Sequence, residues 1–315
     1  MRLKFYFPVA ALCLVFAMQA NFAQKPKPVS QTGRTRTITI VTEPKAIVWI
    51  NDVRYGTTDE NGKLTFKMIS GGAKKIRVRA DGFKESTQNL LATQKGEVKV
   101  ALTETTDEAE LAFQQAGTLS SIDREKAVEM YKRAISLRSK YPEAYLEMAR
   151  VLADAGNFEE ALEAVKQARK LRPLYSEASA VEGRILKSNG DDDAAIAAFK
   201  RSITEGKGFQ PEAHTGLGLF YREKAEGFGA SGDFDNEKEY YILAAAEMKK
   251  AIAQLSGAPD AITIYQLLGD CYERVKMYKE AIAVYEEFLR VFPDVNEVTA
   301  VQSFITQIKK QMSEQ

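Results

Sequence analysis

Apolar residues in the C-terminal two thirds of the chain recur at helical spacing, and the whole helical pattern repeats about every 34 residues. The repeat is clearest in residues 142–174 and from residue 262 to 293. Matching offsets hold large and small apolar residues on one face of each helix: Tyr145, Ala149, Leu152, Ala161 and Ala168 in the first copy, and Tyr265, Gly269, Tyr272, Ala281 and Phe288 in the second. Small residues allow neighbouring helices to approach, so the pattern predicts helix pairs stacked into a solenoid.

Three weaker copies extend the array to residues 107–293. They cover residues 108–141, residues 176–204 and a stretch that opens at Pro211. In the last of these, the residues of the second helix arrive 14 positions late. We therefore expect an insertion within 223–240 that either lengthens both helices or forms a projecting loop. Residues 294–315 form one more amphipathic segment, which predicts a capping helix after five helix pairs.

Before the array, residues 36–104 alternate with a period of two, which is typical of β-strands. The expected strands are Thr37–Val41, Ala46–Ile50, Leu64–Met68, Lys74–Ala80 and Glu97–Leu102. Turn residues lie between them at Asn61-Gly62, Gly71-Gly72 and Asp81-Gly82. This pattern predicts a small all-β sandwich of about 70 residues, near the lower limit for independent folding.

The N-terminus has a different composition. Residues 1–23 begin with Arg2 and Lys4, continue in a short apolar run and end in small residues around Ala20 and Ala23. This order predicts a cleaved signal peptide, with cleavage after Ala20 or Ala23, and hence an exported protein. An uncleaved membrane anchor is the alternative, but the apolar run is shorter than the roughly 20 residues that span a bilayer. Residues 24–35 have the composition of a linker.

The helical copies resemble the tetratricopeptide repeat (TPR), because their large, small and large residues and the terminal Pro173 and Pro293 keep that family's spacing. The resemblance implies that the first helices line a groove that holds an extended peptide or a partner helix. Six candidate groove residues follow from the family's groove-facing offsets: Leu146, Arg150, Arg184, Lys187, Leu219 and Arg222. The four cations among them either form a positive ladder for carboxylate or phosphate groups, or pair with neighbouring glutamates.

The β-region resembles the PEGA domain, a small β-module of bacterial and archaeal envelope and surface proteins. The likeness rests on Thr42-Glu43-Pro44-Lys45-Ala46, Val48-Trp49-Ile50-Asn51-Asp52, Tyr55-Gly56-Thr57-Thr58 and Asp81-Gly82-Phe83. Lys45 stands where the family has glycine. A transthyretin-like sandwich is the alternative. The resemblance implies a periplasmic or cell-surface location in a bacterium.

Charge divides the chain more sharply than its overall net charge of +1 suggests. Between Gln24 and Glu104 there are 15 Lys and Arg against 8 Asp and Glu, a net charge of +7, whereas residues 105–315 carry 27 against 35, a net charge of −8. Lys75, Arg77 and Arg79 point to one side of an expected strand. They are either a solvated outer face or a contact for something anionic: an envelope polymer, a lipid headgroup layer or the acidic array of the same chain.

Catalytic chemistry has little support in the sequence. The single histidine, His214, takes the place of a packed large residue, and Cys271 takes that of a small buried one. Residues 227–232 match the spacing G-x-G-x-x-G, but without the preceding strand of a dinucleotide site we expect a flexible turn. Asp191-Asp192-Asp193 indicates the start of a helix. Trp49 is expected to be a core residue and not one that stacks on a carbohydrate.

We therefore expect no cofactor, no metal, no nucleic-acid partner and no enzymatic activity. The sequence favours an exported scaffold or adaptor of the cell envelope, whose array binds a protein or peptide while the β-region contacts an anionic envelope polymer, a membrane surface or a second protein. A structural, self-assembling surface component is the alternative, and an enzyme of an unrecognised kind is the third. The sequence leaves the partner and the oligomeric state open.

Overall fold

Nine β-strands precede the helices in the computed structural model, which describes residues 35–69 and 73–314. The expected signal peptide, the linker up to residue 34 and the Gly71-Gly72 turn lie outside these residues. The strands are β1 Thr35–Val41, β2 Ile47–Ile50, β3 Val53–Thr57, β4 Lys63–Ile69, β5 Lys74–Arg79, β6 Phe83–Lys84, β7 Ser86–Leu90, β8 Gly96–Lys99 and β9 Thr103–Glu104. We call this part, residues 35–104, the β-module.

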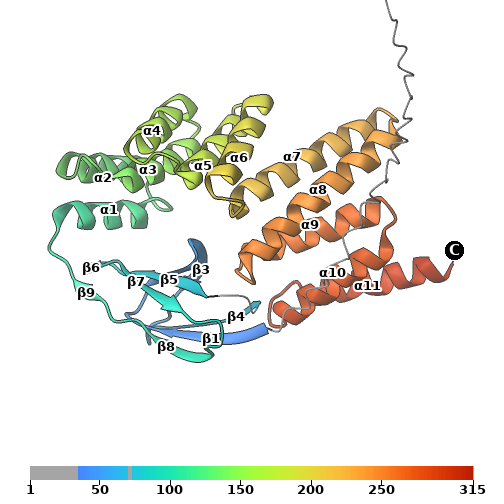
Figure 1. Cartoon of the computed structure of the whole chain (residues 1–315), viewed down its shortest axis with the longest axis horizontal. Helices are drawn as coiled ribbons and strands as arrows, with labels where there is room; N and C mark the ends of the chain where they lie inside the picture. Colours follow the sequence, from blue (N-terminus) through green and yellow to red (C-terminus); the bar gives the residue numbers. More distant parts are fainter. Residues whose placement is uncertain (1–34, 70–72, 315) are drawn as a thin grey trace, which may run out of the picture. The chain divides into compact units, whose positions relative to one another are not determined.

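The β-module contains two main sheets (Figure 1). One has the order β4-β1-β8, with β1 antiparallel to β4 and parallel to β8. The other is antiparallel with the order β3-β2-β5-β7, and β6 pairs separately with β9. Alternate residues of the central strands are fully buried, among them Ile38, Ile40, Val48, Ile76 and Val78. The module is therefore built on the apolar residues that alternate along its strands, as the period of two predicts.

Five strands lie where they were expected, with no end shifted by more than three residues, whereas β3, β7 and the short β6–β9 pair were not predicted. The prediction failed at β7 because Ser86–Leu90 is polar and buries only its last residue. It failed at β3 because Arg54 and Gly56 interrupt the apolar run. Trp49 is also not a core residue: Val48 and Ile50 face the core, and Trp49 lies on the opposite, partly exposed face of β2.

Eleven helices follow in the described residues. They are α1 Glu108–Leu119, α2 Arg124–Leu137, α3 Pro142–Asp154, α4 Phe158–Leu171, α5 Ser176–Ser188, α6 Asp192–Glu205, α7 Pro211–Ala230, α8 Phe234–Leu255, α9 Ala261–Arg274, α10 Tyr278–Val291 and α11 Val298–Ser313. We call residues 108–313 the array. Its five helix pairs and final helix confirm the predicted solenoid, and no described helix is long and apolar enough to cross a membrane.

The extra residues of the fourth pair lengthen both helices. At 20 and 22 residues, α7 and α8 are longer than the other helices of the array. Residues 227–230 belong to α7, so the stretch with G-x-G-x-x-G spacing is a helix end with a short turn at Ser231–Asp233. The expected turn is thus present only in its last residues, and nothing in the structure tests their flexibility. The Asp191 carboxylate accepts a hydrogen bond from the Ala194 amide, which confirms helix capping at that position.

Small residues on the first helices are required by close packing. A Cβ atom added to Gly269 of α9 would lie 2.2 Å from the Tyr285 ring of α10. One added to Gly183 of α5 would lie 2.6 Å from the Phe199 ring of α6. The repeated large and small pattern of the sequence therefore marks where paired helices touch.

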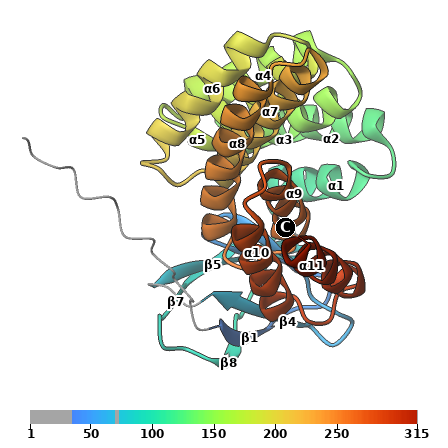
Figure 2. The same ribbon diagram turned by 90° about the vertical axis from the view of Figure 1, so that its right-hand side faces the viewer.

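The β-module contacts both early and late parts of the array. At the late contact, the core of the module continues into that of α8 to α11 as one hydrophobic cluster, and α10 lies beside β4 (Figure 2). Tyr55 of β3 is 3% exposed, and its hydroxyl lies 3.0 Å from the carbonyl oxygen of Leu255 and 2.9 Å from that of Ser256. Burial raises the pKa of this phenol, so it stays protonated and donates. We call this contact the clasp.

The early contact is more polar and lies next to the join between the two parts. The Gln114 side chain of α1 accepts a hydrogen bond from the Gly82 amide at 2.9 Å and donates one to the Phe83 carbonyl at 2.8 Å. The Arg79 guanidinium of β5 stacks on the Phe113 ring of α1, 4.6 Å from its centroid. The helices from α1 to α8 are thus held to the same module near both ends.

Candidate functional site

The first helices of the repeats present a polar stripe that we call the inner face of the array. It consists of charged residues spaced three, four or seven apart on each helix, together with one apolar residue: Glu143, Glu147, Arg150 and Asp154 of α3, Glu177, Arg184 and Lys187 of α5, Glu212, Leu219, Arg222 and Glu226 of α7, and Asp270 of α9. Residues at this spacing share one side of a helix. A glutamate stands in the first turn of α3, α5 and α7 alike.

Arg150 links three consecutive repeats. Its two terminal nitrogens bind both carboxylate oxygens of Glu212 at 3.1 and 3.0 Å, and Nη2 also lies 3.2 Å from Glu177. Burial opposes charge on Arg150, but Glu212, Glu147 and Glu177 outweigh it and hold the pKa of Arg150 well above its usual value. Burial also acts to raise the pKa of Glu212, and Arg150 more than reverses this, so that the pKa of Glu212 is lowered. Both partners of this pair are therefore charged.

The other three predicted groove cations are paired as well. Arg184 lies 3.3 Å from Asp154 and 3.8 Å from Glu212. Lys187 contacts Asp192 at 3.0 Å and Glu223 at 2.8 Å. Arg222 reaches Glu226 at 2.8 Å and Asp270 of the next repeat at 3.4 Å. The structure thus favours the second of the two interpretations: these cations are bound by carboxylates, several from neighbouring repeats, and do not form an open positive ladder.

The two predicted groove leucines lie in different environments. Leu146 is 1% exposed and belongs to the core of the early repeats, so its assignment to the groove was wrong. A step of one residue turns a helix by about 100°, and Glu147 is the residue on the inner face. Leu219 is 44% exposed and lies on the same stripe as Glu212 and Arg222. It is the apolar residue of the inner face.

The predicted basic face of one strand is confirmed on β5, because Lys75, Arg77 and Arg79 alternate with the buried Ile76 and Val78. Only Lys75 is freely exposed. Arg77 stacks on Trp49 at 4.4 Å and contacts Asp52 and Glu85, and the Arg79 side chain is 17% exposed and bound to Glu85 at 2.7 Å. Trp49 thus supports an arginine, which neither the core assignment nor the carbohydrate-stacking alternative anticipated.

The anionic contact of this strand is found in part within the chain itself. Arg79 lies 3.9 Å from Glu110 of α1, in addition to its stacking on Phe113. Arg77 also acts on Glu177 of α5: burial raises the pKa of Glu177, and Arg150 and Arg77 act against this rise. Through Arg79, the outer face of β5 therefore contacts the first helix of the array.

The single histidine of the chain is packed. His214 is 4% exposed, and its Nδ1 lies 2.6 Å from Glu247. No group of three or more His, Cys, Asp or Glu side chains arranged to hold a metal ion occurs in the described part of the chain. Neither histidine-based catalysis nor a metal centre is indicated by these residues.

Cys271 is fully buried in α9, where burial raises the pKa of its thiol to about 12. Because the thiolate is the reactive form, we expect native protein produced without residues 1–23 to react with an aromatic disulfide reagent at pH 8 at least about a hundredfold more slowly than unfolded protein. The released thiolate, followed by absorbance with and without denaturant, measures both rates. Equal rates would show that Cys271 is accessible.

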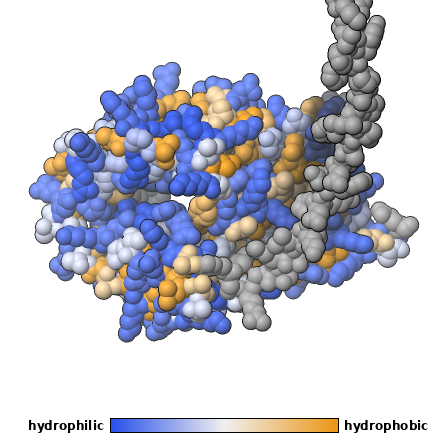
Figure 3. Space-filling view, viewed as in Figure 1, coloured by the Kyte–Doolittle hydropathy of each residue, from blue (hydrophilic) through white to orange (hydrophobic). Residues whose placement is uncertain are grey.

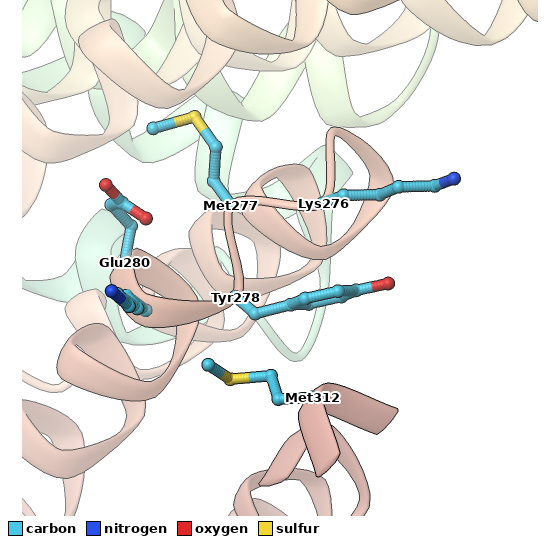
Figure 4. A pocket seen from close by; sticks show the side chains of 6 residues that line it. Lys276, Met277, Tyr278, Glu280 and Met312 are labelled. Atoms are coloured by element: carbon cyan, nitrogen blue, oxygen red, sulfur yellow. The ribbon is translucent and has the colours of Figure 1, made fainter. Parts of the chain in front are cut away.

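A shallow pocket of about 340 Å³ lies at the C-terminal end of the array. Figure 4 shows Met277 and Tyr278, from the start of α10, above Met312 near the end of α11, with Lys276 pointing in the same direction as Tyr278. None of the predicted site residues lines it. On the face of the molecule in Figure 3, hydrophilic residues predominate and hydrophobic ones form only small groups.

Comparison with known proteins identifies the helical repeats. Models of the tetratricopeptide repeat match residues 146–211 and 262–295. No curated protein matches the chain significantly.

Among solved structures, MamA of Desulfovibrio magneticus RS-1 is 21% identical, with 60% of this chain and 98% of that chain covered and a TM-score of 0.42. A thermophilic TPR protein of Thermus thermophilus is 18% identical, with coverages of 64% and 98% and a TM-score of 0.44. YrrB, described as a TPR protein with an unusual peptide-binding site, is 16% identical, with coverages of 63% and 94% and a TM-score of 0.39. These superpositions are loose, so the assignment of the repeats rests on the family models and on the observed helix pairs.

Proposed function

We propose that this chain, which carries tetratricopeptide repeats, is a non-enzymatic scaffold of a bacterial cell envelope that binds a protein or peptide partner on the inner face of its array. One observation carries the proposal: the first helices of successive repeats place charged groups and the exposed Leu219 on one continuous face. TPR proteins are in general protein–protein interaction modules. Paired charges with an apolar residue among them suit a peptide that offers both hydrogen bonds and an apolar side chain.

Export and envelope location rest on residues 1–23 and on the resemblance of the β-module to the PEGA domain. The mature N-terminus of protein recovered from the envelope fraction tests them, since it should begin after Ala20 or Ala23. A protein that keeps residue 1 and stays in the cytosol contradicts this part of the proposal.

The groove is tested with Leu219→Arg beside Ile242→Arg. Leu219 on α7 and Ile242 on α8 are 44% and 43% exposed, but only Leu219 lies on the inner face. An arginine at position 219 would place a bulky charge in the centre of the interface, so we expect a loss of partner binding of about tenfold or more, with no loss for Ile242→Arg. Crosslinking and affinity capture from the envelope fraction of the native host, quantified by mass spectrometry, measures the effect.

Self-assembly is the alternative outcome of the same experiment. If all three forms capture only the protein itself, in equal amounts and with concentration-dependent association, the chain is a structural surface component. If both variants lose one partner equally, the partner does not use the inner face.

A further inference from the structure

A second pocket, of about 360 Å³, lies between the β-module and the array. Its lining consists of Asn51, Asp52, Lys75, Arg77 and Thr87 from the module and Phe209 from the loop between α6 and α7. Lys75 and Arg77 point outward from β5, and Thr87 is the register partner of Arg77 on β7. The strand alternation that buries the module's core thus places two cations and a hydroxyl on one wall. Phe209, 36% exposed, supplies an apolar wall from the array.

The polar wall is pre-arranged and has a free cation. Arg77 is held by stacking on Trp49 and by contacts with Asp52 at 3.5 Å and Glu85 at 3.4 Å. The Lys75 backbone amide donates to Asn51 Oδ1 at 2.8 Å, which fixes the turn beside the strand. Within residues 35–69 and 73–314, the Lys75 ammonium has no ion-pair partner. An anion in the pocket would therefore gain an unpaired ammonium without displacing an existing ion pair.

The charge and shape of the pocket define the ligand. Asp52, whose side chain is 78% exposed, offsets one of the two cations, so the pocket suits a single carboxylate and not a dense polyanion. The apolar wall at Phe209 suits a hydrophobic neighbour of that carboxylate. The loop of the array that carries Phe209 also stands over the sheet, and the Arg77 side chain is only 24% exposed. A flat membrane surface would therefore reach Lys75 but not Arg77, whereas a peptide side chain fits between the two walls.

The pocket also lies close to the inner face, because Phe209 stands two residues before Pro211, where α7 begins, and Glu212 in the first turn of α7 belongs to the inner face. We propose that the β-module supplies the second wall of the peptide site, and that the pocket at Lys75 and Phe209 receives an acidic side chain flanked by an apolar residue of the bound peptide. This inference rests on the proposed function and narrows it, because it assigns the module a part in recognising the partner.

Trp49, the only tryptophan of the chain, is a built-in reporter, because it lies against Arg77 at the edge of this pocket. The probe is the acetylated, amidated peptide GSFEFSG, and its matched control is GSFQFSG, which lacks only the charge. For the full chain we expect the glutamate peptide to change the Trp49 emission saturably, and to bind about tenfold more tightly than the glutamine peptide.

The variant Lys75→Gln should bind the glutamate peptide about tenfold more weakly than wild type, and Lys99→Gln should bind it as wild type does. Lys99 is also an exposed lysine, on β8 of the other sheet, so it controls for the change in net charge. Equal affinity for the two peptides, or equal weakening by the two variants, would overturn the pocket assignment. A third outcome separates the pocket from the proposed function. If neither peptide binds but a partner is captured in a way that depends on Leu219, the pocket assignment is overturned and the scaffold function stands.

Discussion

Replacing Tyr55 by alanine is expected to lower the free energy of unfolding by about 3–5 kcal/mol and to separate the unfolding of the β-module from that of the array. The ring is buried beside Phe66, with centroids 4.5 Å apart, and the hydroxyl reaches the last turn of α8. The truncation removes packing in the hydrophobic cluster shared by the two parts, and it leaves the Leu255 and Ser256 carbonyls without this donor. Tyr55→Phe keeps the ring and should cost only about 1–2 kcal/mol.

Two spectroscopic signals distinguish the parts during urea unfolding. Trp49 fluorescence reports the β-module, and far-ultraviolet circular dichroism reports the helices. The two midpoints should coincide in wild type and separate in Tyr55→Ala, with the module unfolding first. Tyr265→Phe, which removes a buried hydroxyl bonded to Glu287 at 3.0 Å within the last repeat, should destabilise without separating the midpoints. Coincident midpoints in Tyr55→Ala would show that the clasp does not couple the two parts.

Replacing Arg150 by methionine is expected to cost about 2 kcal/mol at neutral pH. Removing one partner of a buried pair costs roughly 3–5 kcal/mol, and the estimate here is smaller because the side chains of Arg150 and Glu212 remain 24% and 30% exposed. Methionine preserves the apolar stem and the helix propensity. The cost arises because Glu177 and Glu212 then face each other without their shared cation. Arg274→Met, which removes an exposed pair within one helix, should change stability by no more than about 0.5 kcal/mol.

The loss of stability caused by Arg150→Met should depend on pH. Because the pKa of Glu212 is lowered in the native protein, the stability that its pairing contributes is present above the unfolded pKa of glutamate and is lost as the pH falls through the lowered value. The difference between wild type and variant should therefore be full at pH 7 and shrink below about pH 4. Urea titrations across this range measure it. A deficit that stays constant down to acidic pH would indicate lost packing and not lost pairing.

The helical part of the fold was predictable because its signal is local and repeated. Gly269 and Tyr285 show why: the contact that requires a glycine lies within one repeat, and equivalent residues recur at the same offset in other copies. In the β-module the central strands were predictable from buried alternation, but Ser86–Leu90 was not. It hydrogen-bonds along β5 at the edge of its sheet, so its backbone pairing determines its structure while its side chains stay largely exposed.

The candidate site was predictable only to the level of a helix face. Offsets carried over from the family selected Arg150 and Arg184, whose ion pairs join neighbouring repeats, but they also selected Leu146, which is buried, in place of Glu147. That the cations are paired depends on carboxylates such as Glu212, which lies 62 residues from Arg150. The contact of Tyr55 with Leu255 spans 200 residues and follows no period, so no pattern in the sequence indicated it.

The clasp also limits how many repeats the array can gain or lose. An open solenoid tolerates the gain or loss of a repeat, because each unit contacts only its neighbours. Here the helices from α1 to α8 begin beside β6 and β9 and return to β3, so their number has to match the distance that the small β-module spans. A duplicated 34-residue unit between them would carry Leu255 away from Tyr55. Growth by duplication is therefore disfavoured between α1 and α8.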